Sequence, residues 1–255
     1  MTQPIIDILM YHSISKREGP TNIAPEVFKA HMDAIADAEV PVITLDHLLA
    51  AQAGEFDLAP YSIIITFDDG FLDFAEQAYP VLDDHGFTAI VYLPTGCLGG
   101  VETWRGALTP PRKLMDWGQV RELMAEGINF GSHSVTHPDL DTLNARTLIE
   151  ELRASKQTLE DMLSVPIDHF APPYGVADFY TRSTVERLYR TSVGTRFERA
   201  TMDSDIIDLP RLEMYYYANP DRWADHVNGR GQAYLTRRKT MRYARENLYR
   251  PWERV

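Results

Sequence analysis

The sequence predicts an α/β fold, a barrel of about seven parallel strands whose outside is covered by helices. Strand-like and helix-like stretches alternate along most of the 255 residues, which is typical of repeated βα units. Polar residues directly follow several predicted strands, where barrels of this kind carry their sites. With 44% hydrophobic residues the chain can bury a substantial core, and α/β barrels of this length are commonly one domain.

The predicted strands share short runs of apolar and β-branched residues. They are residues 5–11, 40–44, 61–67, 88–93, 128–131, 169–172, 191–194 and 206–212. The predicted helices between them show apolar residues at helical spacing or a glycine just past the last turn. They are residues 25–36, 46–53, 71–85, 116–126, 144–163 and 178–190. Gly and Pro residues predict a long loop over residues 94–111.

A change of charge divides the chain. Residues 221–255 hold nine Lys or Arg against four Asp or Glu, a net charge of +5, whereas the whole chain carries −12. We expect residues 1–220 to form the barrel domain. We expect residues 221–255 to form a basic, helical extension that packs on the barrel or on a second subunit of a homo-oligomer. Contact with an anionic lipid or an acidic glycan is the alternative for this extension.

Composition argues against several classes of protein. General nucleic-acid binders are basic, so a net charge of −12 predicts no nucleic-acid partner. No apolar stretch approaches the ~18 residues of a membrane span, and the first residues lack a signal-peptide pattern. The single cysteine, Cys97, excludes an internal disulfide. We therefore expect a cytoplasmic protein, or an extracytoplasmic one if the sequence was trimmed.

The central predicted strand ends in two acidic residues. Residues 61–67 lead into Asp68 and Asp69, and Gly70 ends the strand. Adjacent carboxylates at the end of an apolar strand repel each other. A nearby cation would relieve this repulsion and allow one acid to bind it while the other acts as a base. Two solvated carboxylates that cap the next helix are the alternative.

Two histidines four residues apart are candidate metal ligands. His133 and His137 follow the predicted strand 128–131, and their spacing places two imidazoles on one side of a helical turn. A catalytic zinc site commonly has three protein ligands of N and O type and an open position for water. The two histidines and one carboxylate would complete such a set. Two histidines in a polar loop are the alternative.

These motifs resemble those of the polysaccharide deacetylase family, carbohydrate esterase family 4. Residues 66–70 (Thr-Phe-Asp-Asp-Gly) match its first motif and residues 133–137 (His-Ser-Val-Thr-His) match its second. Residues 170–175 (Phe-Ala-Pro-Pro-Tyr-Gly) are similar to its third. The resemblance covers residues 5–212 in the same order, and it implies a distorted (β/α) barrel, a divalent metal and release of acetate from an N-acetylated sugar.

The resemblance also implies roles for residues at the matching positions. Asp68 would be the general base. Asp69, His133 and His137 would hold one divalent metal, with Zn expected and Co, Ni or Mn as alternatives.

Three further residues are candidates for substrate binding. Pro173 and Tyr174 belong to the third motif, and the backbone amide of Tyr174 would help to bind the oxyanion. Trp104 lies in the loop 94–111, where it could stack on a sugar ring. A core position is the alternative for Trp104.

The chain departs from the family pattern in two places. The third motif usually carries an Arg that orients the catalytic Asp, but Ala171 stands there. Arg211 could supply this guanidinium, or it could pair with a surface acid such as Asp208. The family's late motif, a hydrophobic strand ending in the general-acid His, is missing after Arg211. The strand 5–11 followed by His12 is similar to the family branch that carries this motif at the front, which includes poly-N-acetylglucosamine deacetylases, so His12 is the expected acid.

Together these residues predict a metal-dependent hydrolase that removes acetyl groups from N-acetylated polysaccharides or oligosaccharides. A metal-activated water would attack the acetyl group, with an Asp as base and a His as acid. An O-acetyl esterase or a non-sugar amidase on the same scaffold is one alternative, because Ala171 breaks the third motif. A catalytically weak sugar-binding protein is the other, and the complete set of base, ligands and acid argues against it.

Overall fold

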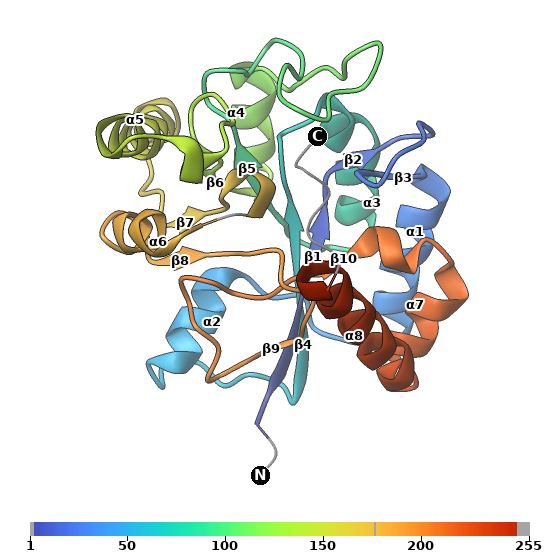
Figure 1. Cartoon of the computed structure of the whole chain (residues 1–255). Coiled ribbons are helices and arrows are strands. Elements are labelled where there is room, and N and C mark those ends of the chain that lie inside the picture. Colours follow the sequence, from blue (N-terminus) through green and yellow to red (C-terminus); the bar gives the residue numbers. More distant parts are fainter. Residues whose placement is uncertain (1–2, 176, 249–255) are drawn as a thin grey trace.

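The computed structural model describes residues 3–175 and 177–248. Its central element is a curled, mostly parallel sheet of eight strands with helices on its outer side (Figure 1). The strands run in the order β10-β1-β4-β5-β6-β7-β8, and β9 pairs antiparallel with β1. The predicted α/β fold is therefore confirmed, in the form of a distorted barrel.

The elements of the main sheet are short except for two strands. They are β1 (Ile5–Tyr11), β4 (Tyr61–Phe67), β5 (Ile90–Leu93), β6 (Asn129–Ser132), β7 (His169–Phe170), β8 (Thr191–Ser192), β9 (Ala200–Thr201) and β10 (Leu212–Glu213). A separate parallel pair consists of β2 (Ser13–Ile14) and β3 (Asn22–Ile23). The α-helices are α1 (Pro25–Asp37), α2 (Leu45–Gln52), α3 (Tyr79–Asp84), α4 (Trp117–Ala125), α5 (Ala145–Leu163), α6 (Phe179–Glu186), α7 (Pro220–Val227) and α8 (Gln232–Leu248). Short π or 3-10 turns are η1 (Phe74–Ala78), η2 (Leu140–Thr142), η3 (Pro173–Gly175) and η4 (Met214–Tyr217).

Two of the predicted strands are wrong over most of their length. Residues 40–44 contribute one parallel bridge, from Val42 to β4, before Thr44 caps α2. In the predicted strand 206–212 the ladder is interrupted at Pro210, which has no amide hydrogen to donate. The small β2–β3 pair and β9 had no counterpart among the predicted elements, whereas α7 and α8 lie in the extension that was predicted to be helical.

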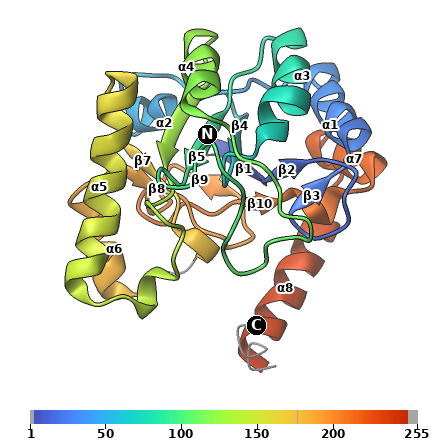
Figure 2. The same cartoon turned by 90° about the horizontal axis from the view of Figure 1, so that it is seen from above.

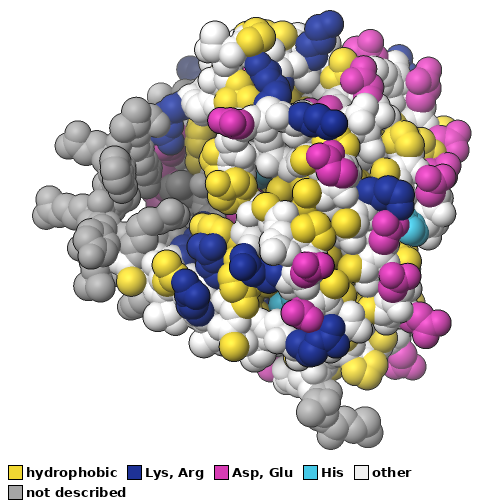
Figure 3. Space-filling model, turned by 90° about the vertical axis from the view of Figure 1, so that its right-hand side faces the viewer, with side chains coloured by type: hydrophobic (Ala, Val, Ile, Leu, Met, Phe, Trp, Pro, Cys, Tyr) yellow, Lys and Arg dark blue, Asp and Glu magenta, His cyan; other side chains and the backbone are white. Residues whose placement is uncertain are grey.

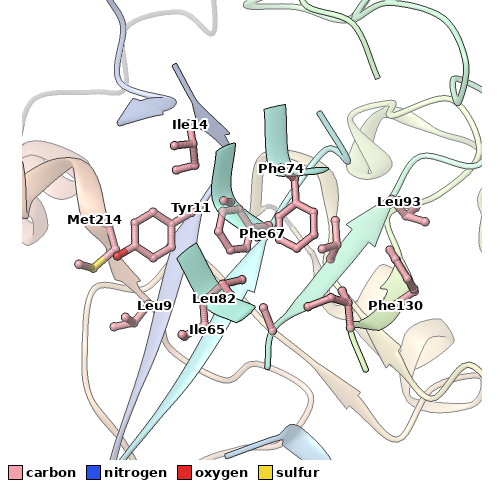
Figure 4. Close-up of a cluster of buried hydrophobic side chains, with 14 of the residues drawn as sticks. Leu9, Tyr11, Ile14, Ile65, Phe67, Phe74, Leu82, Leu93, Phe130 and Met214 are labelled. Atoms are coloured by element: carbon pink, nitrogen blue, oxygen red, sulfur yellow. The ribbon is translucent and has the colours of Figure 1, made fainter. Parts of the chain in front are cut away.

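Buried residues of the long strands alternate between the two sides of the sheet. Tyr11 and Phe67 point outward into the apolar layer beneath the helices (Figure 4). Ile8 and Ile64 point inward and form a second cluster inside the curl of the sheet. Because side chains of a strand alternate, the inner side of β4 continues to Asp68, directly after the strand ends.

Residues 209–213 join the two edges of the curled sheet. Leu209 bridges Val193 beside β8, and Leu212 pairs with Leu9 in β1. Two backbone hydrogen bonds support the first contact, from the Gly194 amide to the Leu209 carbonyl at 2.8 Å and from the Leu209 amide to the Ser192 carbonyl at 2.9 Å. The first and last strands are therefore neighbours, and residues from both ends of the chain reach the interior.

A buried acidic residue connects the C-terminal helices to the sheet. Asp7 in β1 is fully buried and accepts hydrogen bonds from Tyr61 Oη at 2.7 Å, Arg199 Nε at 2.7 Å and His226 Nε2 at 2.8 Å. Burial alone would raise the pKa of Asp7, but His226 and Arg199 outweigh it and hold this pKa below its ordinary value. His226 belongs to α7, which packs on α1, so α7 is part of the helical cover.

The last described helix, α8, extends away from the barrel (Figure 2). Residues 249–255 of the predicted extension lie outside the described residues, and the domain boundary at residue 220 stays a prediction. Acidic side chains are spread over the flank shown in Figure 3, and a group of Lys and Arg side chains lies at its lower left. Within the described residues, none of the helices has the length and apolar character of a membrane span. The predicted cytoplasmic location and homo-oligomer stay predictions.

Candidate active site

A cleft of about 300 Å³ at the carboxyl ends of the strands brings together most of the predicted site residues. Its lining includes His12, Asp68, Asp69, Trp104, His133, His137, Tyr174 and Glu213. Arg211 is fully buried and contacts Asp68. Pro173 is buried next to Tyr174 and is not among the residues that line this cleft.

Arg211 holds the carboxylate of Asp68 with both ends of its guanidinium. Nη1 donates to Oδ1 and Nη2 donates to Oδ2, each at 2.7 Å. Nη1 also donates to Thr66 Oγ1 at 3.0 Å, and Nε donates to the Gly194 carbonyl at 2.9 Å. Burial alone would raise the pKa of Asp68, but the charge and hydrogen bonds of Arg211 outweigh it and hold this pKa below its ordinary value. Asp68 is thus an ionised carboxylate of fixed orientation.

The structure distinguishes the two partners considered for Arg211. Asp208, the alternative acid, pairs with Arg196 at 3.4 Å instead. Ala171, where the third motif usually has its Arg, lies in the apolar cluster inside the sheet. The guanidinium at Asp68 therefore comes from the segment that closes the barrel, across 143 positions of sequence.

His12 faces Asp68 across two neighbouring strands. Met10 pairs with Thr66 in the β1–β4 ladder, so the residues two positions further along, His12 and Asp68, lie on the same side of the sheet. His12 Nε2 is 3.9 Å from Asp68 Oδ2, and its side chain is 15% exposed. This imidazole is therefore within reach of a group bound in the cleft.

Asp69, His133 and His137 form the three-residue group that could hold a metal. Asp69 Oδ1 lies 3.3 Å from His133 Nε2 and 3.2 Å from His137 Nε2. Tetrahedral bonds of about 2.0–2.1 Å would place neighbouring donor atoms roughly 3.3 Å apart. One carboxylate oxygen and two imidazole nitrogens are also the donor types of catalytic zinc sites. The three side chains therefore fit a divalent metal such as Zn.

The orientation of His133 supports this fit. Its Nδ1 lies 2.6 Å from the Ala171 carbonyl, and only a protonated Nδ1 can donate to that oxygen. In the neutral imidazole, Nε2 then presents a lone pair towards Asp69, as a metal ligand would. Without a metal, burial would lower the pKa of His133, but Asp69 and Asp68 outweigh it and raise this pKa, so a protonated Nε2 can donate to Asp69. His137 has no hydrogen-bond partner for its buried Nδ1 within the part of the chain that the structure describes.

The segment His133–His137 is a tight bend, so the predicted helical turn is wrong. Ser134 and His137 have φ of 65° and 57°, in the left-handed region. Glu151 of α5 accepts hydrogen bonds from the amides of Val135 and Thr136 at 2.8 and 3.0 Å. The bend, secured by this carboxylate, turns both imidazoles towards Asp69. No local spacing links Glu151 to residues 15 and 16 positions earlier, so its contact with the bend could not be predicted from the sequence.

Backbone strain is concentrated at the site. Six non-glycine residues among those described have positive φ, and Asp69, Ser134, His137 and Tyr174 are four of them. Such conformations cost about 1–3 kcal/mol each and persist only where the surroundings enforce them. The φ of 75° at Asp69 turns the chain so that Asp68 faces Arg211 while Asp69 faces the histidines. Two adjacent acids thereby receive different partners.

Two aromatic rings pack against His137. The Trp104 ring stacks on it at 4.4 Å between centroids, and the Tyr174 ring meets it edge-on at 4.8 Å. The loop that carries Trp104 is secured by a buried ion pair, with Arg112 Nη2 2.7 Å from Glu102 Oε2. The predicted sugar contact of Trp104 stays a prediction.

Several known proteins are similar to this chain. The sequence profile of a family described as polysaccharide deacetylase matches residues 57–193. YxkH of Bacillus subtilis, which is assigned to the polysaccharide deacetylases, is 26% identical over 210 residues, 82% of this chain and 71% of YxkH.

Two solved structures resemble the fold. The Streptococcus pyogenes deacetylase PplD, in complex with acetate, has a TM-score of 0.73 and 25% identity over 83% of this chain and 92% of its own. IcaB from Ammonifex degensii has a TM-score of 0.73 over 89% of this chain and 97% of its own; its 21% identity indicates a shared fold alone.

Proposed function

Because the chain belongs to the polysaccharide deacetylase family, we propose that it is a metal-dependent hydrolase that removes the acetyl group from an N-acetylated sugar. One observation carries the proposal: the two adjacent carboxylates have different partners. Asp69 lies against two imidazoles, as a metal ligand would, and Asp68 lies against a guanidinium, as an oriented base would.

In this proposal Asp69, His133 and His137 hold one divalent metal, with Zn as the expected ion and Co, Ni or Mn as alternatives. When bound, the metal would lower the pKa of a water molecule and polarise the acetyl carbonyl.

The remaining steps are assigned to three side chains and one backbone amide of the site. An oxygen of the Asp68 carboxylate accepts the proton of the attacking water, and Arg211 keeps this carboxylate ionised and aimed into the cleft. The backbone amide of Tyr174 donates to the oxyanion as the tetrahedral carbon forms. His12 Nε2 donates a proton to the nitrogen of the sugar as the C–N bond breaks, and acetate and a free amine result.

The first experiment is metal analysis of the purified protein together with acetate release from N-acetylglucosamine oligomers, with and without chelator. We expect about one metal per chain and acetate release that stops with chelator. Metal without acetate release from these oligomers, but with release from acetyl-xylan, would favour the O-acetyl esterase. No metal and no release would contradict the proposal.

Two variants separate the proposed roles of the carboxylates. Asp69→Ala should lose the metal, whereas Asp68→Asn should keep it and lose at least about 100-fold in turnover. Metal retained at wild-type stoichiometry in Asp69→Ala would remove this residue from the ligand set.

A further inference from the structure

A second and larger cleft, of about 470 Å³, opens beside the catalytic one. Gly175 and Thr195 line both clefts. A methyl group in place of a hydrogen of Gly175 would lie 2.0 Å from Thr195 Cγ2, so the chain is closely packed where the clefts meet. The two clefts therefore adjoin at the contact between Gly175 and Thr195.

The second cleft has a basic wall in an otherwise acidic protein. Three parts of the chain supply it: α6, the segment after β8, and α8. The charged side chains of the lining are Arg182, Arg196, Lys239 and Arg242, against Glu198 and Asp208. The whole chain carries −12, so an excess of positive charge in a cleft is a local exception.

The acids of this wall are each shared between two cations. Asp208 Oδ2 lies 3.4 Å from Arg196 and 3.9 Å from Arg182, and Glu198 contacts both Arg196 and Lys239. Arg182 also pairs with Asp205, which is not in the lining of the cleft. The cations remain 36–51% exposed. Exposed ion pairs contribute little free energy, typically about 0–1 kcal/mol, so an incoming anion can take over their donors.

Arg242 connects the two clefts electrostatically. It lines the second cleft, and it also acts on Glu213 in the lining of the first. Burial raises the pKa of Glu213, and the charges of His12, Arg211 and Arg242 oppose that effect. One cation of the basic wall is therefore close enough to the catalytic cleft to influence a carboxylate in its lining.

We propose that the second cleft binds an acidic group, a carboxylate or a phosphate, carried by a sugar residue next to the one that loses its acetyl group. Guanidinium groups bind both of these anions through paired hydrogen bonds, and Lys239 supplies a further charge. The substrate is then an acidic glycan rather than a neutral one. This inference rests on the proposed deacetylase function, because it takes the catalytic cleft to hold the acetylated sugar.

The test is calorimetric binding of two ligands to chelator-treated protein. They are the N-acetylglucosamine tetramer and the same tetramer with a terminal primary hydroxyl oxidised to a carboxylate, and mass spectrometry verifies that both stay intact. We expect the carboxylated tetramer to bind about tenfold more tightly at low salt, and we expect this preference to shrink at high salt because screening weakens exposed charge pairs. Equal affinities, or no binding of either ligand, would overturn the inference.

Variants on one helix provide the control. Lys239→Gln and Arg242→Gln should each reduce the preference for the carboxylated ligand about two- to fivefold. Arg237→Gln removes an equal charge from an exposed position of α8 that is not in the cleft lining, and it should leave the preference unchanged within twofold. An equal effect of all three variants would refute binding in the cleft.

A further arm uses vesicles that contain phosphatidylglycerol. Vesicle binding that is lost in Lys239→Gln and Arg242→Gln, without any preference between the tetramers, would assign the basic wall to lipid and overturn the inference. Failure of the deacetylase proposal itself would appear separately, as absence of acetate release from both tetramers by the untreated protein.

Discussion

Replacing Arg211 with Met would leave the Asp68 carboxylate buried without its counter-charge. The change keeps an unbranched side chain and removes four hydrogen bonds, two to Asp68 and one each to Thr66 and Gly194. Removing one partner of a buried ion pair typically costs about 3–5 kcal/mol. The free energy of unfolding should fall by about that amount, and acetate release should fall at least about 100-fold because the base is no longer oriented.

A double-mutant cycle isolates the contribution of the pair. Asp68→Asn alone leaves the Arg211 guanidinium buried beside a neutral amide, so it should also destabilise the protein. The double variant buries neither charge, and its loss should be smaller than the sum of the single losses by about 1–3 kcal/mol. Urea unfolding followed by tryptophan fluorescence measures the three losses, with chelator present so that metal binding does not contribute. Losses that add within about 0.5 kcal/mol would refute the coupling.

Two further predictions concern residues outside the reacting groups. Glu151→Ala should weaken metal binding about 10–100-fold, because the bend between the two histidine ligands loses the acceptor of its backbone amides. Glu150→Ala, on the same helix and exposed, is the matched control, and equal affinity in both variants would contradict the assigned role. Because the pKa of Asp7 is lower in the folded than in the unfolded chain, its stabilisation is present above about pH 4 and is lost as the pH falls below that value. Asp7→Asn should therefore flatten the fall in unfolding free energy between about pH 5 and pH 3, and an unchanged slope would show that another carboxylate causes it.

The features that could be predicted from the sequence are those that depend on residues close together in the chain. The alternation of strands and helices and the acids after the central strand predicted the family and the barrel, and both are confirmed. The bend at His133–His137 was predicted as a helical turn, because a four-residue spacing does not reveal the left-handed backbone of Ser134 and His137. The assignments of individual catalytic roles stay predictions.

The features of the site that could not be predicted from the sequence depend on contacts between distant segments of the chain. The choice between two acids for Arg211 depends on how residues 209–213 close the barrel, and Asp68 lies 143 positions away. Glu151 reaches the histidine bend from a helix whose periodicity describes only its apolar face. The interrupted strand before Leu212 reflects Pro210, which permits a bridge on each side but no continuous ladder.

The candidate metal ligands and the other candidate catalytic residues come from different parts of this chain. The three metal-ligand candidates lie between residues 69 and 137, inside the family match at 57–193, whereas His12 and Arg211 lie outside it on opposite sides. A chain whose first and last strands were not paired would retain the candidate ligands, and His12 would stay beside Asp68 through the β1–β4 pairing, but the guanidinium of Arg211 would not reach Asp68. In the proposed mechanism, binding of a metal would therefore not be sufficient for turnover, because the orientation of Asp68 by Arg211 depends on the pairing of the first and last strands.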